Sequence, residues 1–380
     1  MLRTFLALAL AAILGSAAPP AAAQAAAAIP FEFVQERQIL LPITVNGVAA
    51  EAWLDSGASA TVLDAAFARR LHLPLHGRVR ARGVSGRVPG VRLSHVDLEA
   101  ANLSFEHRRV AVMDLSTISA AVQRPVQVIL GRDVFDEAVV EIDFQTQTMA
   151  FLPRDTFQPA AAAPVPLSRS GDLRSLPMVI AGAPTEAILD LGNAGGLLID
   201  RDFADSRGLL AGRRVSTQLS VGADGAQEGA LVSLDGVEVG GLSLDGVPTV
   251  AAAELASHAP ANVGLAVLSR FHLTIDFAGD RIWLKPYPGA TEAPFRKNRS
   301  GLGLAPDQGR LRVTHVGAGS PAEAAGWRVG EAIVAIDGQP IAADYIAGPQ
   351  SRWNTAPAGS VVTLSMADGS QRRLTLGDYY

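Results

Sequence analysis

The chain of 380 residues contains no cysteine. It can therefore form no disulfide, no thiolate nucleophile and no thiolate metal site, and its folded state must rest on a packed core. Aromatic residues make up 6% of the chain and charged residues 18%. The formal net charge is only −5, which argues against nucleic acid as the main partner. Sparse aromatic and charged residues, together with 37 glycines, favour a β-rich globular protein with many turns.

The sequence also lacks the motifs of several familiar enzyme classes. The sequence has no Gly-x-Ser-x-Gly nucleophile elbow, no phosphate-binding loop and no dinucleotide fingerprint, and we expect no cofactor. His72 and His76 are four residues apart, but Pro74 between them disfavours the helix that would align both on a metal ion. We therefore predict no metal site.

The N-terminus has the pattern of a secretory signal peptide. Arg3 gives a basic start, an apolar run covers Phe5 to Leu14, and three small residues, 21–23, offer a cleavage site. We predict a signal peptide over residues 1–23, with a membrane anchor that is never cleaved as the alternative. The apolar run is short for a bilayer crossing, and no other long apolar run follows. We expect a mature protein that is exported, in a bacterium to the periplasm, without stable membrane insertion.

The chain repeats one pattern around two aspartates, Asp55 and Asp190. The first copy contains Leu41-Pro42, Gly47, Glu51-Ala52, Leu54-Asp55 and Gly57. At the same offsets, the second contains Leu176-Pro177, Gly182, Glu186-Ala187, Leu189-Asp190 and Gly192. Such a repeat implies two similar lobes, each with one Asp-x-Gly turn. Two facing turns would bring two carboxyl groups together, as acid–base hydrolysis of peptides requires.

Short apolar runs bounded by turn residues predict the β-strands of the first lobe. These runs are Ile39–Val45, Ala50–Leu54, Val110–Asp114, Val126–Leu130 and Val139–Phe144. Helical spacing predicts one helix over Val62–Leu71. We predict a first lobe over residues 31–153, an Ala/Pro linker over 154–166, a second lobe over 167–286 and a third, different unit over 299–380.

The first aspartate turn reads Asp55-Ser56-Gly57-Ala58 and follows an apolar run. A glycine at this point lets the backbone turn back, so that amides can point at the carboxylate. Taken alone, an Asp/Ser/Gly turn is common in any protein. The context is more specific, because a second apolar run leads into Gly131, and Asn262-Val263-Gly264 occupies the matching place in the second lobe.

Two glycine-containing segments have the composition of mobile hairpins that cover a site. In the first lobe this flap candidate consists of Gly83, Val84, Ser85 and Gly86. In the second lobe, Val221-Gly222-Ala223-Asp224-Gly225 takes the corresponding position. An extended polypeptide would then bind between these hairpins and the aspartate turns.

With the Asp55–Ala58 signature and the Leu130-Gly131-Arg132-Asp133 stretch, the two lobes resemble retropepsin-like aspartic proteases of the bacterial secreted type. The resemblance implies a mainly β fold of two tandem, pseudo-symmetric β-barrel lobes in a pepsin-like bilobed arrangement. It implies an aspartic endopeptidase in which two aspartates activate a water for attack on a peptide carbonyl. Carried over to this chain, the catalytic residues are Asp55 and Asp190, and the residues that support the turns are Ser56, Gly57, Gly192 and Asn193.

The second turn, Asp190-Leu191-Gly192, departs from this family, which has Ser or Thr after the aspartate. In the family, that hydroxyl ties the two turns together across the lobe interface. Ser56 can make this contact from one side, whereas Leu191 cannot return it, and Asn193 could supply a polar contact instead. Two alternatives stay open: a non-catalytic peptide-binding protein with a degenerate second site, and a homodimer that uses two Asp55 turns. With both lobes in one chain, we expect a monomer.

The third unit resembles a PDZ domain over residues 299–380, most strongly along Val313–Pro340. Within it, Ser320 and Glu323 fit a capping box, and Pro321 suits the first position of a helix. The resemblance implies that backbone amides hold the terminal carboxylate of a peptide, or an internal peptide, which adds as an edge strand. These amides would be those of Leu302, Gly303 and Leu304. The alternative is a glycine-rich turn in a unit that only packs on the lobes.

Overall fold

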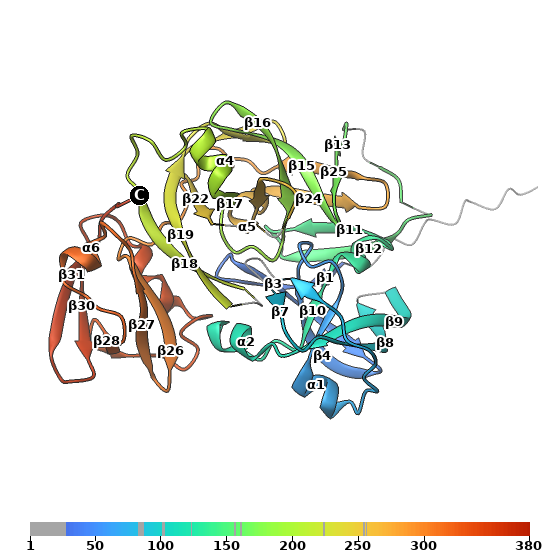
Figure 1. Ribbon diagram of the computed structural model, residues 1–380, viewed down its shortest axis with the longest axis horizontal. Helices are drawn as coiled ribbons and strands as arrows, with labels where there is room; N and C mark the ends of the chain where they lie inside the picture. The colour runs from blue at the N-terminus through green and yellow to red at the C-terminus, as the bar shows by residue number, and fades with distance from the viewer. Residues whose placement is uncertain are drawn as a thin grey trace, which may run out of the picture.

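The structure is a computed structural model. It describes residues 28–380 apart from 83–86, 101–102, 123, 156, 160–161, 223–224, 254 and 256. The predicted signal peptide and the flap candidate Gly83–Gly86 lie outside the described residues, as do two residues of the second hairpin. Figure 1 shows two β-rich lobes and a smaller β unit beside them.

The first lobe is built on a sheet that closes on itself, because β3 pairs with both β4 and β8. In order, its strands are β2 (Glu32–Val34), β3 (Gln38–Val45), β4 (Val48–Leu54), β10 (Val128–Leu130), β5 (Val62–Asp64), β9 (Leu103–Met113) and β8 (Arg92–Ala100). The helices are α1 (Ala65–Arg70), α2 (Ser116–Val122) and α3 (Arg132–Phe135), and β6 (Ala81–Arg82) pairs with β7 (Arg87–Val88).

The second lobe repeats this arrangement. Its sheet has the order β18 (Ser216–Gly222), β19 (Gly225–Leu234), β22 (Val247–Ala252), β17 (Leu197–Asp200), β23 (Ala261–Val263), β16 (Ala183–Leu189), β15 (Leu173–Ile180), β20 (Val237–Val239) and β21 (Leu242–Leu244), with β14 (Ser168–Ser170) on β15. The helices are α4 (Arg201–Ser206) and α5 (Leu265–Leu268). Strands β3 and β15 have the same succession of buried and exposed positions, as equivalent strands of two repeats should.

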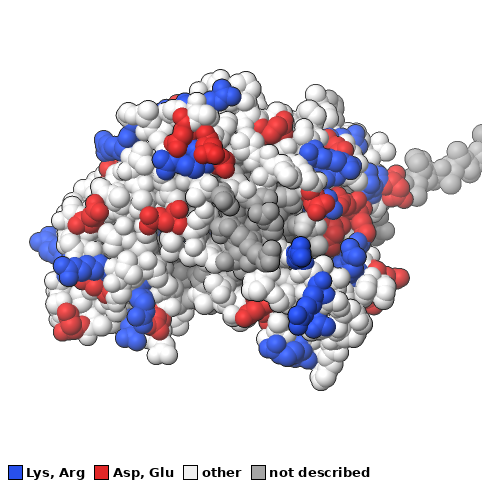
Figure 2. Space-filling view, in the orientation of Figure 1, with Lys and Arg blue, Asp and Glu red and all other residues white. Residues whose placement is uncertain are grey.

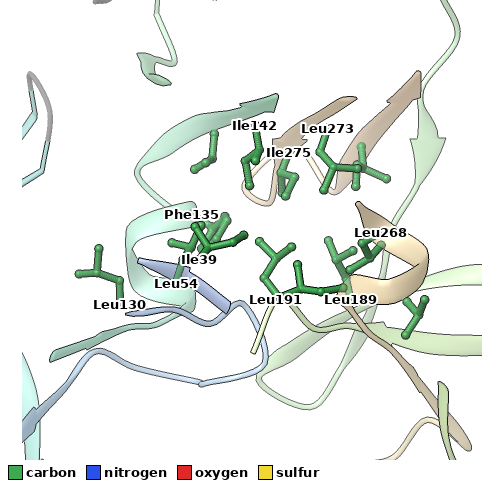
Figure 3. Close-up of a cluster of buried hydrophobic side chains, with 14 of the residues drawn as sticks. Ile39, Leu54, Leu130, Phe135, Ile142, Leu189, Leu191, Leu268, Leu273 and Ile275 are labelled. Carbon is green, nitrogen blue, oxygen red and sulfur yellow. The ribbon is translucent and has the colours of Figure 1, made fainter. Parts of the chain in front are cut away.

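A sheet shared by both lobes joins them. Its order is β1 (Ile29–Pro30), β12 (Thr148–Pro153), β11 (Ala138–Asp143), β24 (Phe271–Asp276), β25 (Arg281–Pro286) and β13 (Val165–Pro166). At its centre, β11 of the first lobe pairs antiparallel with β24 of the second, with Ile142 opposite Leu273. Apolar side chains of both lobes pack under these strands in a single cluster (Figure 3). The two aspartate turns are therefore brought together within one chain.

The third unit has its own sheet and its own core. Its elements are β26 (Leu302–Asp307), β27 (Arg310–Val316), α6 (Pro321–Ala324), β28 (Ala332–Ile336), β29 (Gln339–Pro340), the 3₁₀ helix η1 (Pro349–Thr355), β30 (Val361–Met366) and β31 (Gln371–Thr375). The predicted cap of α6 is confirmed, because the Ser320 hydroxyl accepts a hydrogen bond from the Glu323 N–H at 3.2 Å. The unit contacts both lobes, through Ala318 with Ser216 and through Ala347 with Gln35.

The predicted strands of the first lobe are confirmed, with shifted ends, but the predicted helix over Val62–Leu71 begins too early. Its first three residues form β5, which lies between β10 and β9. The helix starts only at Ala65, where Asp64 caps it. The error has a physical reason: Val62 and Leu63 are both buried, and in so short an apolar run a buried strand has no alternation to distinguish it from a helix.

Candidate active site

Each aspartate stands at the end of a strand in the same local structure. Asp55 follows β4, which runs parallel to β10, and its N–H donates to the Leu130 carbonyl at 2.9 Å. Asp190 follows β16, which runs parallel to β23, and its N–H donates to the Val263 carbonyl at 3.1 Å. The buried strands thus deliver both carboxyl groups in equivalent positions, one from each lobe.

The two turns approach each other so closely that each glycine lies against the opposite carboxyl group. A Cβ atom on Gly57 would be 2.6 Å from Cγ of Asp190, and one on Gly192 would be 2.4 Å from Cγ of Asp55. Real Cβ atoms essentially never come within 3.0 Å of another heavy atom in this way. Only glycine fits at these two positions, and the reciprocal approach brings the carboxyl groups face to face.

Backbone amides hold one oxygen of each carboxyl group. Oδ1 of Asp55 accepts from the N–H groups of Gly57 at 2.9 Å and Ala58 at 3.0 Å. Oδ1 of Asp190 accepts from the N–H groups of Gly192 at 2.8 Å and Asn193 at 3.1 Å. The carboxyl groups are therefore fixed in orientation by their own turns, as predicted for Gly57 and Gly192.

The surroundings of Asp55 favour its protonated form. Burial raises the pKa of Asp55 well above its ordinary value, and the neighbouring charge of Asp190 and a hydrogen bond between the two side chains raise it further. The amides of Gly57 and Ala58 act in the opposite direction with smaller effects. Two carboxyl groups in contact cannot both ionise at low cost, so the pair shares one proton.

The tie between the two turns is one-sided, as the sequence predicts. The Ser56 hydroxyl donates to the Leu189 carbonyl at 2.7 Å and accepts from the Leu191 N–H at 3.0 Å. The Leu191 side chain returns no such bond. It is fully buried in the apolar cluster that both lobes share (Figure 3). In the second lobe, apolar packing takes the place of the hydroxyl contact.

The suggestion that Asn193 makes up for the missing hydroxyl across the interface is wrong. Its Nδ2 donates to Oδ1 of Asn262 at 2.8 Å, and its Oδ1 accepts from the Gly195 N–H at 2.8 Å, both within the second lobe. Asn193 does support the Asp190 turn, but through its backbone N–H and through Asn262.

Asn262 is a site residue that the sequence did not predict. It lies on β23, and its Nδ2 donates to Oδ2 of Asp190 at 2.5 Å. Both Ile129 and Asn262 stand two residues before the glycine that ends their strand. Comparing the two repeats at this offset would have shown a polar residue where the first lobe has an apolar one.

The predicted peptide-binding amides lie at the start of β26. The Leu302 N–H already has an internal partner, the Ser300 hydroxyl at 3.0 Å. Gly303 and Leu304 belong to the body of the strand, which forms the edge of its sheet and pairs with β27. These residues are distant in the chain from the aspartate turns, and none of the hydrogen bonds at the carboxyl pair comes from them.

Two stretches of the chain, residues 41–134 and 176–266, match the family model for aspartyl proteases. Each match contains one aspartate turn and continues to the glycine turn behind it. The predicted mainly β fold with two repeated lobes of the aspartic-protease type is thereby confirmed. The two matches support aspartic protease activity in general.

Among solved structures, EIAV protease complexed with the inhibitor HBY-793 is 25% identical. The similarity covers 26% of this chain and 86% of that chain, with a TM-score of 0.22. No curated protein matches the chain.

Proposed function

We propose that the protein is an aspartic endopeptidase that hydrolyses peptide bonds with a water activated between Asp55 and Asp190. The observation that carries the proposal is the reciprocal approach of the two turns, in which each glycine lies against the carboxyl group of the other lobe. A peptide-binding protein without catalysis has no need for two carboxyl groups in contact. The proposed substrate is an extended polypeptide.

The proposed reaction needs one proton shared by the pair. The ionised aspartate takes a proton from water as the water oxygen bonds to the peptide carbonyl carbon, and the protonated aspartate gives its proton to the carbonyl oxygen. In the second step, the tetrahedral diol returns a hydroxyl proton to one carboxylate. The other carboxyl group protonates the leaving nitrogen as the C–N bond breaks. The products are a carboxylic acid and an amine, and the pair is again singly protonated.

The experiment compares wild type with Asp55→Asn and Asp190→Asn in peptide cleavage from acidic to mildly alkaline pH, read by mass spectrometry. We expect wild type to show a bell-shaped profile with an acidic to near-neutral optimum, and both variants to lose cleavage. Cleavage that survives Asp190→Asn and depends on protein concentration would instead support a homodimer of Asp55 turns. If wild type cuts no peptide in a diverse library, the proposal is wrong, and peptide binding without turnover becomes the better account of Leu191.

We further propose that the third unit is a PDZ domain that binds peptides at the edge of β26, through the backbone around Gly303 and Leu304. The place of β26 at the end of its sheet, within the described part of the chain, supports this, because an added strand needs an edge strand as its neighbour. Fluorescence polarisation with the Asp55→Asn protein tests it. Labelled peptides with a free C-terminal carboxylate should bind more tightly than the same peptides as C-terminal amides, and equal binding would argue against carboxylate recognition.

The pattern of residues 1–23 leads us to propose export to the periplasm, which N-terminal sequencing of the mature protein from a periplasmic fraction tests. No helix within the described part of the chain is long and apolar enough to cross a membrane. On the face drawn in Figure 2, acidic and basic side chains are interspersed among uncharged ones. A polypeptide therefore fits as a partner better than nucleic acid, which binds surfaces of concentrated positive charge.

A further inference from the structure

The two carboxyl groups have the same backbone donors but different side-chain donors. At Asp190, Oδ2 accepts the Asn262 amide at 2.5 Å in addition to the two backbone bonds at Oδ1. At Asp55, the position that matches Asn262 is occupied by Ile129, whose side chain has no donor. The pair is thus symmetric in its backbone and asymmetric in its side chains.

The donor at Asp190 is itself held in place. Asn193 donates to Oδ1 of Asn262, which directs the Nδ2 group of Asn262 toward Asp190. The Gly195 N–H in turn fixes Oδ1 of Asn193. In the first lobe, Ala58 takes the place of Asn193, and Ile129 packs in an apolar cluster with Val62, Leu115 and Val126. The two polar residues occur together in the second lobe, and their apolar counterparts occur together in the first.

We propose that Asn262 is a positioning residue that makes Asp190 the ionised, water-activating member of the pair and leaves the shared proton on Asp55. An amide donor stabilises a carboxylate more than a carboxylic acid, so the aspartate with the extra donor is the one that ionises. In the reaction, Asp190 then takes the proton from the attacking water, and Asp55 gives its proton to the peptide carbonyl oxygen. This inference rests on the proposed protease function.

The direction of the asymmetry agrees with the surroundings of Asp55, where burial and the adjacent carboxylate raise the pKa. Other charged groups on the elements packed around the pair have polar partners away from it. These groups and partners are Glu51 with Arg124, Glu186 with Ser175, Asp133 with Thr61, Arg132 with Asp136, Asp200 with the start of α4, and Glu141 with His272. Asn262 is therefore the group to vary.

The test measures pH profiles of kcat and kcat/KM for wild type and Asn262→Leu, which keeps the side-chain size but removes the donor. Loss of a donor to the ionised carboxylate raises the lower apparent pKa of the pair, so the acidic limb of the profile moves to higher pH. At the optimum, kcat should fall about tenfold to hundredfold, the effect of one hydrogen bond to a charged group. Asn193→Ala should move the same limb by less, since it removes only the hydrogen bond that orients the Asn262 amide.

A matched control is Ile129→Leu at the equivalent position of the first lobe, which removes no donor and should leave both limbs in place. If Asn262→Leu raises KM while both limbs stay unmoved, Asn262 contacts substrate, and the proposal is overturned.

Titration of the aspartate carboxyl carbons by ¹³C NMR gives a readout that needs no catalysis. We expect the lower pKa of the pair to be higher in Asn262→Leu, and in Asn193→Ala by less, than in wild type. If wild type cuts no peptide, the proposed function fails but this comparison still stands. Identical titration curves for wild type and both variants would show that Asn262 does not bias the proton, even in an active protease.

Discussion

At the residue scale, Gly57 and Gly192 set how closely the two carboxyl groups can approach. A methyl group at either position would collide with the opposite aspartate at 2.6 Å or 2.4 Å from Cγ. We predict that Gly57→Ala and Gly192→Ala each lower kcat/KM at least a hundredfold and destabilise the fold by about 1–3 kcal/mol, because the lobes must move apart. Cleavage assays and urea denaturation measure both effects.

The matched control for these two glycine variants is Gly377→Ala in the third unit, where the added Cβ would lie at an ordinary 3.6 Å from the nearest atom, in Pro321. It should change cleavage and stability little. Near-wild-type cleavage by Gly57→Ala would mean that the turns are farther apart than the structure has them.

Ser56 is the second residue-scale feature, since its hydroxyl ties the two turns together. Ser56→Ala leaves the Leu189 carbonyl and the Leu191 N–H buried without their partner. We predict a loss of about 1–3 kcal/mol in the free energy of unfolding, which is the cost of leaving such buried groups without a hydrogen-bond partner. Ser243→Ala, at an exposed serine, should cost less than about 0.5 kcal/mol. Equal unfolding midpoints for the two variants would contradict the tie.

A site residue could be predicted from the sequence where the same residue recurs in both repeats. Asp55, Asp190 and the glycine turns were predictable, because an aspartate after an apolar strand recurs at fixed offsets. The Asn193–Asn262 contact was not, because it joins residues far apart in the chain and occurs in one lobe only. A repeat shows what is shared, whereas this contact is where the two copies differ.

At the element scale, Asp64 decides where α1 begins. Its Oδ2 accepts from the N–H groups of Ala66 at 2.8 Å and Phe67 at 3.1 Å, and its Oδ1 accepts from the Leu115 N–H at 3.1 Å. We predict that Asp64→Ala lowers the free energy of unfolding by about 1–2 kcal/mol, since it removes the cap. Chemical denaturation monitored by circular dichroism tests this.

The control for the cap is Asp202→Ala in the first turn of α4, where the aspartate is exposed and the cap is Asp200. We expect Asp202→Ala to change the free energy of unfolding by no more than about 0.5 kcal/mol. If Asp64→Ala changes the free energy of unfolding as little as Asp202→Ala does, the start of α1 does not depend on the Asp64 side chain.

Strand β5, which directly precedes α1, explains why the strands were predicted better than the helix. The strands of the first lobe are marked by apolar runs between turn residues, which is a local signal. Strand β5 instead owes its conformation to its neighbours, with Val62 opposite Ile129 on one side and Ala111 on the other. Pairing with strands that lie far away in sequence overrides the helical spacing of its apolar residues.

At the scale of the whole molecule, the sequence predicted the pairing of the lobes but not the docking of the third unit. The repeat resumes downstream as Ile142-Asp143-Phe144 and Ile275-Asp276-Phe277, whose first two residues end β11 and β24, the strands that join the lobes. The third unit docks on the second lobe through polar contacts, such as His315 Nε2 with the Thr217 carbonyl at 3.0 Å on β18, and through an apolar cluster in which Tyr379 packs with Leu231 and Val250. Contacts between single side chains on two separate surfaces carry no periodic signal, so this docking needed the structure.

The stability of the whole molecule should depend on pH through the carboxyl pair. Burial raises the pKa of Asp55 in the folded protein, so the folded state binds its proton more tightly than the unfolded chain, where an aspartate titrates near a pKa of about 3.9. Stability from this group is complete below that pH and is lost as pH rises toward the pKa of Asp55 in the fold. Asp55→Asn removes the titration and keeps the shape. We predict that the thermal unfolding midpoints of wild type and Asp55→Asn differ by a constant amount in acid. As pH rises above about 4, the midpoint of the variant should rise relative to that of wild type. Parallel curves across that range would mean that folding does not raise the pKa of the carboxyl pair.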